Sequence, residues 1–240
     1  MSILPIDTGR YGTKEMLDIF REQKKIDYQL AIEAAAALSQ SEIGLIPLSI
    51  ARDISKIAKS GKITAKRIKQ LEAKSDHDTA ALVEALAEKC NKESRPWIHY
   101  GLTSNDLVDT SNSMQMRDAI KIIQPKVSKL SLILAKNAVK HKSVPAVGRT
   151  HGQHASIISF GLKFANWAAE MSTHLERLDE IKKRVLICKT LGVVGTGSLM
   201  GKNAVKVQER VAKKLGLYSA KVTTQIVPVS YTHLTLPTKA

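Results

Sequence analysis

Two histidine-containing segments carry the residues best able to do chemistry in this chain. The first, Gly148–Ala155, reads GRTHGQHA and places His151 between a threonine and a glycine, just ahead of a long helical pattern. A histidine on a glycine-flanked bend can project its imidazole into a cleft, and its ordinary pKa lets it give or take a proton near neutral pH. The second, His99–Asp106, reads HYGLTSND and opens another long helical pattern. Together the two segments predict a site that uses histidine acid–base chemistry.

The hydroxyl residues of the second segment also suit a purely structural role. Thr103 and Ser104 are good helix N-caps, and Asp106 suits a first helical turn. The two interpretations are compatible, because a helix N-terminus presents free N–H groups and positive partial charge. Hydroxyls and amides at such a position can bind a carboxylate.

Two other patterns could suggest a phosphate-binding loop or a metal site, but each lacks part of the required motif. Gly192–Ser198 reads GVVGTGS and resembles a phosphate-binding loop, but no strand pattern precedes it and no GK[ST] follows. His151 and His154 are three residues apart, yet no third ligand lies nearby in the sequence, so we predict no metal site.

The elements that must position these segments are two long helices. Their apolar residues recur at spacings of three and four, which is typical of helices packed side by side. At ~1.5 Å per residue, each helix would be on the order of 50 Å long. The first set is Met116, Ile120, Ile123, Val127, Leu130 and Leu134, and the second is Phe164, Ala168, Met171, Leu175, Leu178, Ile181 and Val185.

Shorter helices are predicted before residue 100. Residues 13–38 read as one helix with Thr13 as its N-cap, Thr64 is the expected cap of a later one, and Asp76 or Asp78 is expected to begin another. Strand signals are nearly absent. The predicted fold class is therefore all-α, with a short-helix N-terminal domain over residues 1–100 and the first part of an elongated, truncated central helical bundle over residues 101–228.

Composition narrows the class of protein. The formal net charge is +15, which could attract nucleic acid, but the excess is mostly lysine spread over every helix, with little aromatic residue for base stacking. Apolar runs are too short for a membrane span, and the two cysteines lack CxxC spacing. We therefore predict a cytoplasmic protein that binds neither nucleic acid nor membrane.

The two histidine segments, in this order and separated by one helical pattern, resemble the fumarase/aspartase superfamily and, within it, the adenylosuccinate lyases most closely. Arg10-Tyr11, Asp76-His77-Asp78 and Thr223–Val227 extend the resemblance to roughly residues 7–228. It implies an elongated helical bundle that assembles as a homotetramer, with each active site built from three subunits. It also implies that Gly192–Ser198 is a loop between helices near the site, and it implies no cofactor.

The resemblance implies a reaction and a role for each motif residue. Adenylosuccinate lyases release fumarate by β-elimination, from adenylosuccinate to give AMP and from the succinyl-carboxamide ribotide of purine synthesis. His151 would be the general acid that protonates the departing nitrogen. Arg10 and Tyr11 would bind the nucleotide phosphate, while His99 is a weaker candidate near the site. The other implied substrate-binding residues are Asp76, His77, Asp78, Thr103, Ser104 and Gln225.

The base of that reaction is not assigned to any residue here. In the resembled family it is a serine on a flexible loop, and no serine in this chain stands in that motif. We therefore expect an N-terminal part of an enzyme that is inactive alone. Residues 229–240 lose both the helical period and the family pattern, so we expect them not to continue the fold and to be artefactual.

Two alternative functions remain open from the sequence. Another member of the superfamily, such as an argininosuccinate lyase or a carboxymuconate cycloisomerase, would share most of these motifs. Arg10-Tyr11 and Asp76-His77-Asp78 favour the nucleotide-using branch. The other alternative is a non-catalytic, basic helical protein that assembles with itself or binds nucleic acid.

Overall fold

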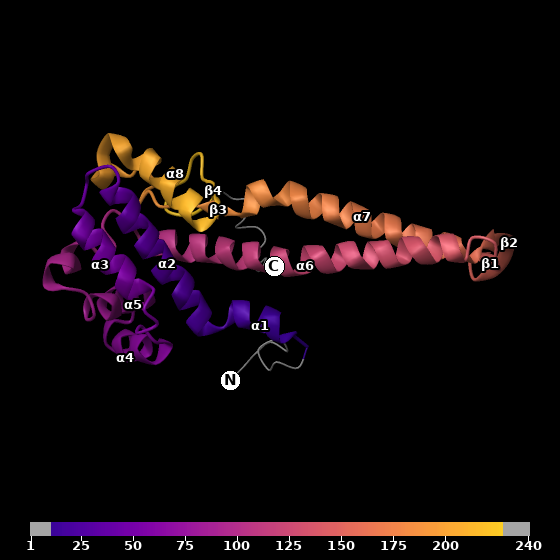
Figure 1. Ribbon diagram of the computed structural model, residues 1–240, viewed down its shortest axis with the longest axis horizontal. Helices are drawn as coiled ribbons and strands as arrows, with labels where there is room; N and C mark the ends of the chain where they lie inside the picture. Colours follow the sequence, from indigo (N-terminus) through magenta and orange to yellow (C-terminus); the bar gives the residue numbers. More distant parts are fainter. Residues whose placement is uncertain (1–10, 228–240) are drawn as a thin grey trace. The chain divides into compact units, whose positions relative to one another are not determined.

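The computed structural model describes residues 11–227, so Arg10 and the predicted tail of residues 229–240 lie outside the described residues. The chain divides into two compact units (Figure 1). Unit 1 comprises the chain up to Asp118 and from Lys183 onward, and unit 2 comprises Ala119–Lys182. The all-α class predicted from the sequence is confirmed. The domain boundaries that we predicted at residues 100 and 228 stay predictions.

Unit 1 is a cluster of helices around one buried helix, α2. Its sequence carries apolar or small side chains on nearly every face, including Ala34–Ala37, and such a helix is stable only when neighbours surround it. It packs against α3 and α8, while α4 packs against α5. The elements are α1 (Lys14–Phe20), α2 (Glu22–Ser41), α3 (Leu48–Ala58), α4 (Ala65–Ser75), α5 (Asp78–Ala87), the 3₁₀ helices Lys92–Trp97 and Ser198–Asn203, α8 (Ala204–Leu215), and the short parallel strands β3 (Ile187–Cys188) and β4 (Tyr218–Ser219).

The single helix predicted over residues 13–38 is two helices. Arg21 adopts an extended conformation between α1 and α2, although no glycine or proline signals a break there. The backbone carbonyl of Ile19 accepts a hydrogen bond from the side chain of Gln115 at 3.1 Å. This tertiary bond holds the chain where α1 ends, and local sequence could not reveal it.

Two predicted caps and one predicted helix start are confirmed. The hydroxyls of Thr13 and Thr64 accept hydrogen bonds from the first turns of α1 and α4. Helix α5 begins at Asp78, one of the two residues expected to begin it. Asp76 ends α4 in a left-handed conformation, and the N-cap of α5 is His77, whose ring accepts from the Ala80 amide.

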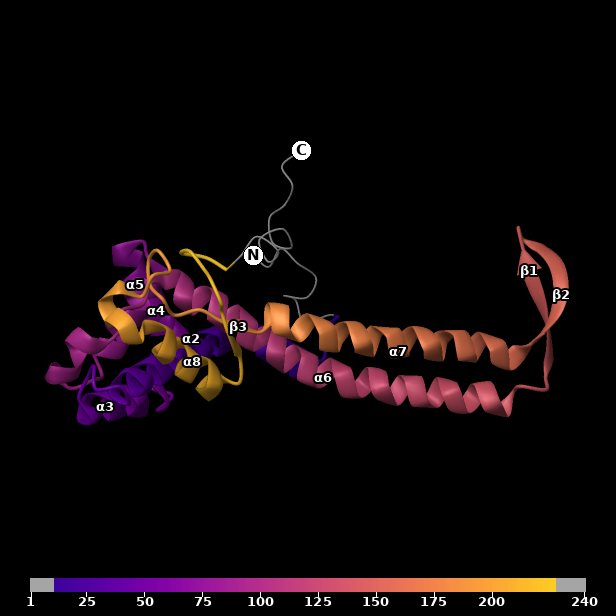
Figure 2. The same ribbon diagram turned by 90° about the horizontal axis from the view of Figure 1, so that it is seen from above.

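Unit 2 consists of two long helical segments joined by a β-hairpin (Figures 1 and 2). Helix α6 (Ser104–Lys140) begins in unit 1 and continues into unit 2, and α7 (Phe160–Val185) follows the hairpin. Both long helices were predicted. The hairpin, β1 (Pro145–Thr150) paired with β2 (Gln153–Ser159), was not. Its strands are mostly exposed, so they lack the alternation of buried apolar residues by which strands are recognised.

The base of the hairpin is fastened tightly to the two helices. The Gly161 amide donates to the His141 carbonyl at 3.1 Å, and the His141 ring packs against the rings of Phe160 and Phe164. A Cβ atom at Gly161 would collide with the Ala138 carbonyl, so glycine is required for this close approach. The hairpin thus projects from a well-packed base.

Across residues 11–227, every helix is too short or too polar to cross a membrane.

Candidate functional site

Backbone conformation marks three of the predicted motifs. Among residues 11–227, the non-glycine residues with positive φ are Asp76 (51°), His99 (61°) and His151 (51°). This left-handed conformation is disfavoured for residues that carry a Cβ, and it concentrates at functional sites. Each of the three lies in a segment that the sequence had singled out. Local strain therefore coincides with the predicted chemistry.

In unit 1, residues from two motifs meet at one pocket. The cavity has a volume of about 400 Å³ and lies at the N-terminal ends of α5 and α6. The structure thus brings together three predicted site residues, His77, Thr103 and Ser104, and adds His99. Its lining residues are His77, Thr79, Ala80, Val83, His99, Leu102, Thr103 and Ser104.

His77 is oriented by its role as a helix cap. Its Nδ1 accepts a hydrogen bond from the Ala80 amide at 3.2 Å. In the neutral ring the proton must then lie on Nε2, which makes that nitrogen a hydrogen-bond donor. The side chain is about half exposed, at 54%. His77 can therefore donate to an anionic group in the pocket without losing its cap.

His99 is held on both its backbone and its ring by one buried carboxylate. Glu33, whose side chain is 2% exposed, accepts from the His99 amide at 3.0 Å and lies 2.6 Å from Nδ1 of the ring. Burial lowers the pKa of His99, but the hydrogen bond and charge of Glu33, with a further contribution from Asp106, outweigh it and raise the pKa overall. The imidazolium form of His99 is therefore stabilised relative to that of a free histidine.

The start of α6 supplies two of the pocket's hydroxyls. Asp106 accepts a hydrogen bond from the Thr103 amide at 3.0 Å, which closes the first turn. The first amides of a helix have no acceptor within it and carry positive partial charge. With Thr79, Thr103 and Ser104 on its wall, the pocket therefore combines two helix N-termini, three hydroxyls and two imidazoles, a donor set suited to a carboxylate.

The remaining predicted residues of unit 1 lie outside the set that lines this pocket. Asp76 and Asp78 flank His77, and the Asp78 carboxylate accepts from the amide and hydroxyl of Thr79 at 2.6 and 3.2 Å. Tyr11 is 71% exposed near the start of α1. Their assignments as substrate-binding residues stay predictions.

Gln225 is exposed, but its segment is anchored to α6. The amide of Val227 donates to the buried carboxylate of Asp109 at 3.0 Å. A Cβ at Gly195 would collide with the Thr223 carbonyl, so the glycine-rich loop and the Gln225 segment approach each other closely. The role of Gln225 likewise stays a prediction.

His151 lies in unit 2, at the turn of the β-hairpin. Thr150 pairs with Gln153, so His151 and Gly152 form a two-residue turn in which both have positive φ. Type I′ hairpin turns require this pattern and favour asparagine or glycine at the first position. His151 is exposed at this left-handed position, and its role as general acid stays a prediction.

Three buried ionisable residues near the pocket were missed by the sequence analysis. Glu33 stands in an alanine-rich run, Asp106 was assigned only to a helical turn, and Lys189 sits in the apolar stretch LICKTLG. The signal that could have revealed them in the sequence was a single charged residue inside an apolar run. Their partners are far apart in sequence, so only the structure could pair them.

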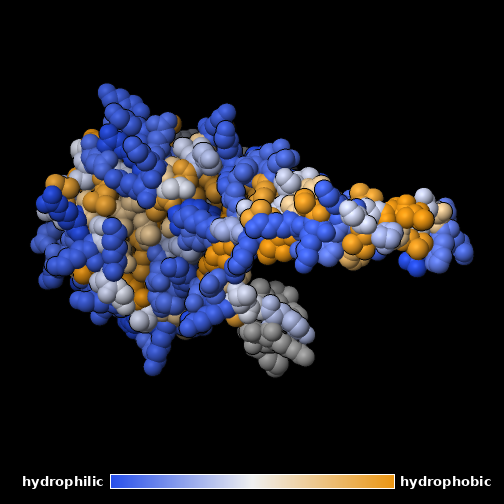
Figure 3. Space-filling model, turned by 45° about the vertical axis from the view of Figure 1, so that its right-hand side comes forward, coloured by the Kyte–Doolittle hydropathy of each residue, from blue (hydrophilic) through white to orange (hydrophobic). Residues whose placement is uncertain are grey.

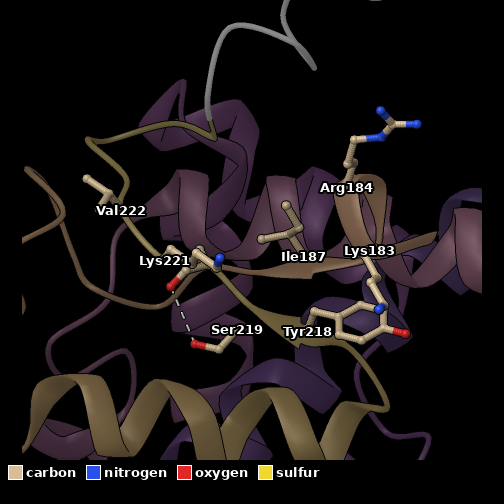
Figure 4. Close-up of a pocket in the computed structure, with 8 residues that line it drawn as sticks. Lys183, Arg184, Ile187, Tyr218, Ser219, Lys221 and Val222 are labelled. Atoms are coloured by element: carbon tan, nitrogen blue, oxygen red, sulfur yellow. Dashed lines mark hydrogen bonds between the residues drawn. The ribbon is translucent and has the colours of Figure 1, made fainter. Parts of the chain in front are cut away.

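A second, larger cavity lies beside β3 and β4 (Figure 4). Its volume is about 530 Å³, and among the described residues its lining includes neither histidine nor carboxylate. Its lining includes the basic residues Lys183, Arg184 and Lys221 and the apolar residue Ile187. Without a group that titrates near neutral pH it is not the predicted acid–base site. Within residues 11–227 we also find no cluster of three histidine, cysteine or carboxylate side chains arranged to hold a metal.

Comparison with known proteins places these features in a family context. Residues 9–235 match a protein-family model described as Lyase. The adenylosuccinate lyase of Methanocaldococcus jannaschii is 44% identical over 227 residues, covering 95% of this chain and 49% of that protein. The adenylosuccinate lyase of Pyrococcus abyssi is 39% identical, with 95% and 50% covered. The chain therefore spans about half the length of the curated relatives it matches.

Solved structures show the same fold. The fumarate lyase from Mesorhizobium sp. BNC1 superposes with a TM-score of 0.82 and 30% identity, covering 89% of this chain and 51% of that one. The 3-carboxy-cis,cis-muconate lactonizing enzyme from Pseudomonas putida gives a TM-score of 0.82 and 29% identity, covering 88% and 49%.

Proposed function

This chain belongs to the Lyase family, and from that premise we propose that it forms part of an adenylosuccinate lyase. Such an enzyme would cleave adenylosuccinate to AMP and fumarate, and it would release fumarate from the succinyl-carboxamide ribotide in the same way. The observation that carries the proposal is the pocket of unit 1, where His77, Thr103 and Ser104 meet at two helix N-termini. Similarity to several curated adenylosuccinate lyases supports the choice of substrate.

The proposed roles follow from the chemistry of a β-elimination. The succinyl group carries carboxylates whose negative charge increases as the C–H proton is removed, so donors placed around them lower the barrier. The hydroxyls of Thr103 and Ser104, the imidazoles of His77 and His99 and the helix amides would supply those donors. His151 would protonate the departing nitrogen as general acid. Arg10 and Tyr11 would bind the nucleotide phosphate, and Asp76, Asp78 and Gln225 would also contact the substrate.

Assembly into a homotetramer with shared active sites is part of the proposal. Unit 2 exposes large apolar side chains along its helices, and Figure 3 displays them as hydrophobic patches on this face. Monomeric proteins rarely leave contiguous apolar area of this kind uncovered. Bundling of these helices with those of other copies would bury it. The exposed residues include Ile123, Leu130, Leu132, Ile133, Leu162 and Trp167.

We also propose that the protein is cytoplasmic. Its partners would be the nucleotide substrate and the other subunits of the tetramer. Both cysteines, Cys90 and Cys188, are free and buried, which suits a reducing compartment.

A carboxymuconate cycloisomerase is the second candidate. The observation that favours it is the structural likeness to the Pseudomonas putida lactonizing enzyme, which equals the likeness to the fumarate lyase. Its tricarboxylate substrate would also suit a pocket of carboxylate donors. The higher identity to adenylosuccinate lyases ranks it second.

A pair of chimeric enzymes separates the two candidates. In the first, residues 1–227 are joined to the matching C-terminal half of the Methanocaldococcus jannaschii adenylosuccinate lyase; this protein is called the chimera below. In the second, the C-terminal half comes from the Pseudomonas putida enzyme. Light scattering establishes that each assembles, and each is assayed on adenylosuccinate and on 3-carboxymuconate.

We expect the chimera to release fumarate from adenylosuccinate and the second protein to be inactive on both substrates. An assembled chimera without fumarate release would contradict the proposal. Turnover of 3-carboxymuconate by the second protein would favour the cycloisomerase.

A further inference from the structure

A lysine and an aspartate form a fully buried ion pair behind the pocket. The side chains of Lys189 and Asp106 are both 0% exposed, and the lysine Nζ donates to Asp106 Oδ1. Removing two charges from water is costly, so a buried ion pair often stabilises a fold no better than apolar residues of the same size. Stability alone therefore does not explain the pair.

One carboxylate joins three separate segments of the chain. While Oδ1 of Asp106 binds Lys189, Oδ2 accepts from the Thr103 amide at 3.0 Å and from the Gly192 amide at 2.9 Å. Thr103 opens α6 and lines the pocket, and Gly192 opens the glycine-rich loop. Asp106 thereby fixes the position of the loop relative to the hydroxyl-bearing helix start.

Lys189 is itself held in register with α6. Its amide donates to the Thr110 hydroxyl at 3.1 Å, and that hydroxyl donates to the Lys189 carbonyl at 3.0 Å. Thr110 lies four residues after Asp106, so both face the same side of the helix. The lysine therefore reaches the carboxylate from a backbone that α6 already holds.

The turn that carries His99 packs against the same loop. A Cβ at Gly192 would lie only 3.1 Å from the Gly101 carbonyl, and the left-handed backbone there also disfavours a side chain, so this close approach suits glycine. The negative charge of Asp106 also acts on the ring, because it adds to the effect of Glu33 in raising the pKa of His99 against the lowering effect of burial.

We propose that Asp106 and Lys189 are positioning residues of this pocket: their ion pair holds the start of α6, the His99 turn and the glycine-rich loop in one arrangement. The pair touches no substrate. That the pocket accepts a substrate carboxylate rests on the proposed function, whereas the positioning itself does not.

The test uses the 240-residue chain and replaces both charges at once, in the variant Asp106→Leu/Lys189→Met. Because no unpaired charge remains, we expect folding to be retained by circular dichroism. Hydrogen exchange of the Gly192 amide should nevertheless accelerate by about tenfold or more relative to amides in the middle of α2. The pKa of His99, followed by NMR, should fall.

Asp109→Leu is the matched control. Asp109 is another largely buried carboxylate of α6, but it binds the Val227 amide instead. It should accelerate exchange at Val227 and leave Gly192 and the His99 pKa unchanged. A role confined to general stability would alter the exchange of all amides alike and would not shift the histidine.

Unchanged Gly192 exchange and an unchanged His99 pKa in the folded double variant would overturn the proposal. If that variant does not fold, the unmutated chain decides: Gly192 and Thr103 amides should exchange as slowly as those of α6, and rapid exchange would overturn it. None of these measurements requires turnover. An inactive chimera would therefore refute the proposed function and leave this inference standing.

Discussion

The pocket of unit 1 and the hairpin of unit 2 hold their histidines in opposite ways. In the pocket, His99 is held by buried Glu33 and lies beside the buried Asp106–Lys189 pair. In the hairpin, His151 is exposed on a two-residue turn whose rigidity comes from strand pairing and from the packed base around His141. The ring of His99 is bound to a carboxylate within unit 1, whereas the imidazole of His151 is exposed.

This difference indicates which role each region can play. A network of buried charges fixes donor positions and suits the binding of a carboxylate whose charge increases during the reaction. An exposed ring on a rigid hairpin suits proton delivery to a group bound by other residues. Mutations should therefore affect stability most in the pocket region and activity most in the hairpin.

The largest expected effect is on turnover. His151→Ala in the chimera should lower kcat by about 10²–10⁴-fold, because it removes a positioned general acid. Substrate binding should change little, since the ring acts mainly in the transition state. Steady-state kinetics on adenylosuccinate measures both. Near-normal kcat in this variant would remove the functional role assigned to the hairpin.

The next effect is on stability and belongs to the pocket region. Lys189→Met alone should destabilise unit 1 by about 3–5 kcal/mol, because it leaves the Asp106 carboxylate buried without its cation. Denaturant unfolding of the 240-residue chain, followed by circular dichroism, gives the value. The double variant Asp106→Leu/Lys189→Met should recover most of the loss; a double variant as unstable as the single one would show that packing, not charge, is responsible.

A smaller effect is expected in the pH dependence of stability. The folded pKa of His99 is raised, because Glu33 and Asp106 outweigh the lowering by burial. Its protonation therefore contributes stability that is complete below the unfolded pKa of about 6.5 and is lost as pH rises through the folded pKa, with a slope of at most about 1.4 kcal/mol per pH unit.

His99→Asn tests that slope. Asparagine tolerates positive φ but does not titrate, so the difference in unfolding free energy between the two proteins should shrink as pH rises above 6.5. A constant difference in unfolding free energy from pH 6 to pH 9 would contradict the raised pKa of His99.

The smallest effect sharpens the contrast between structure and function. His151→Gly relieves the left-handed strain of the turn, so stability should stay unchanged or rise by up to about 1 kcal/mol. Activity of the chimera should nevertheless be lost as fully as in His151→Ala. Thermal unfolding and fumarate release are measured on the same preparation. Destabilisation by glycine would mean that the histidine serves the hairpin rather than the chemistry.

The sequence predicted the parts of the molecule that follow from local periodicity and from motifs. Both long helices and the caps at Thr13 and Thr64 were foreseen, because each depends on residues close together in the chain. The break at Arg21 was not, and the contact found beside it is a tertiary one, from Gln115 to the Ile19 carbonyl 96 residues away. The hairpin around His151 escaped because exposed strands carry no buried alternation.

Much the same division applies to the candidate site. His77, Thr103 and Ser104 were predicted and line one pocket. The carboxylate that holds His99 was not, since Glu33 lies 66 residues earlier and reads as one more helix former. Nor was the pairing of Asp106 with Lys189, 83 residues apart. Local sequence reveals the groups that line the pocket more readily than the buried groups behind them.

Subunit complementation tests most directly the claim that the pocket and the hairpin form parts of shared active sites in an adenylosuccinate lyase. One chimera carries His151→Ala and the other carries His77→Ala, and each alone should release almost no fumarate from adenylosuccinate. When the two are mixed, dissociated and reassembled, hybrid tetramers should regain activity, because some sites then combine an intact His77 from one subunit with an intact His151 from another. Reassembled tetramers as inactive as either parent would contradict the account.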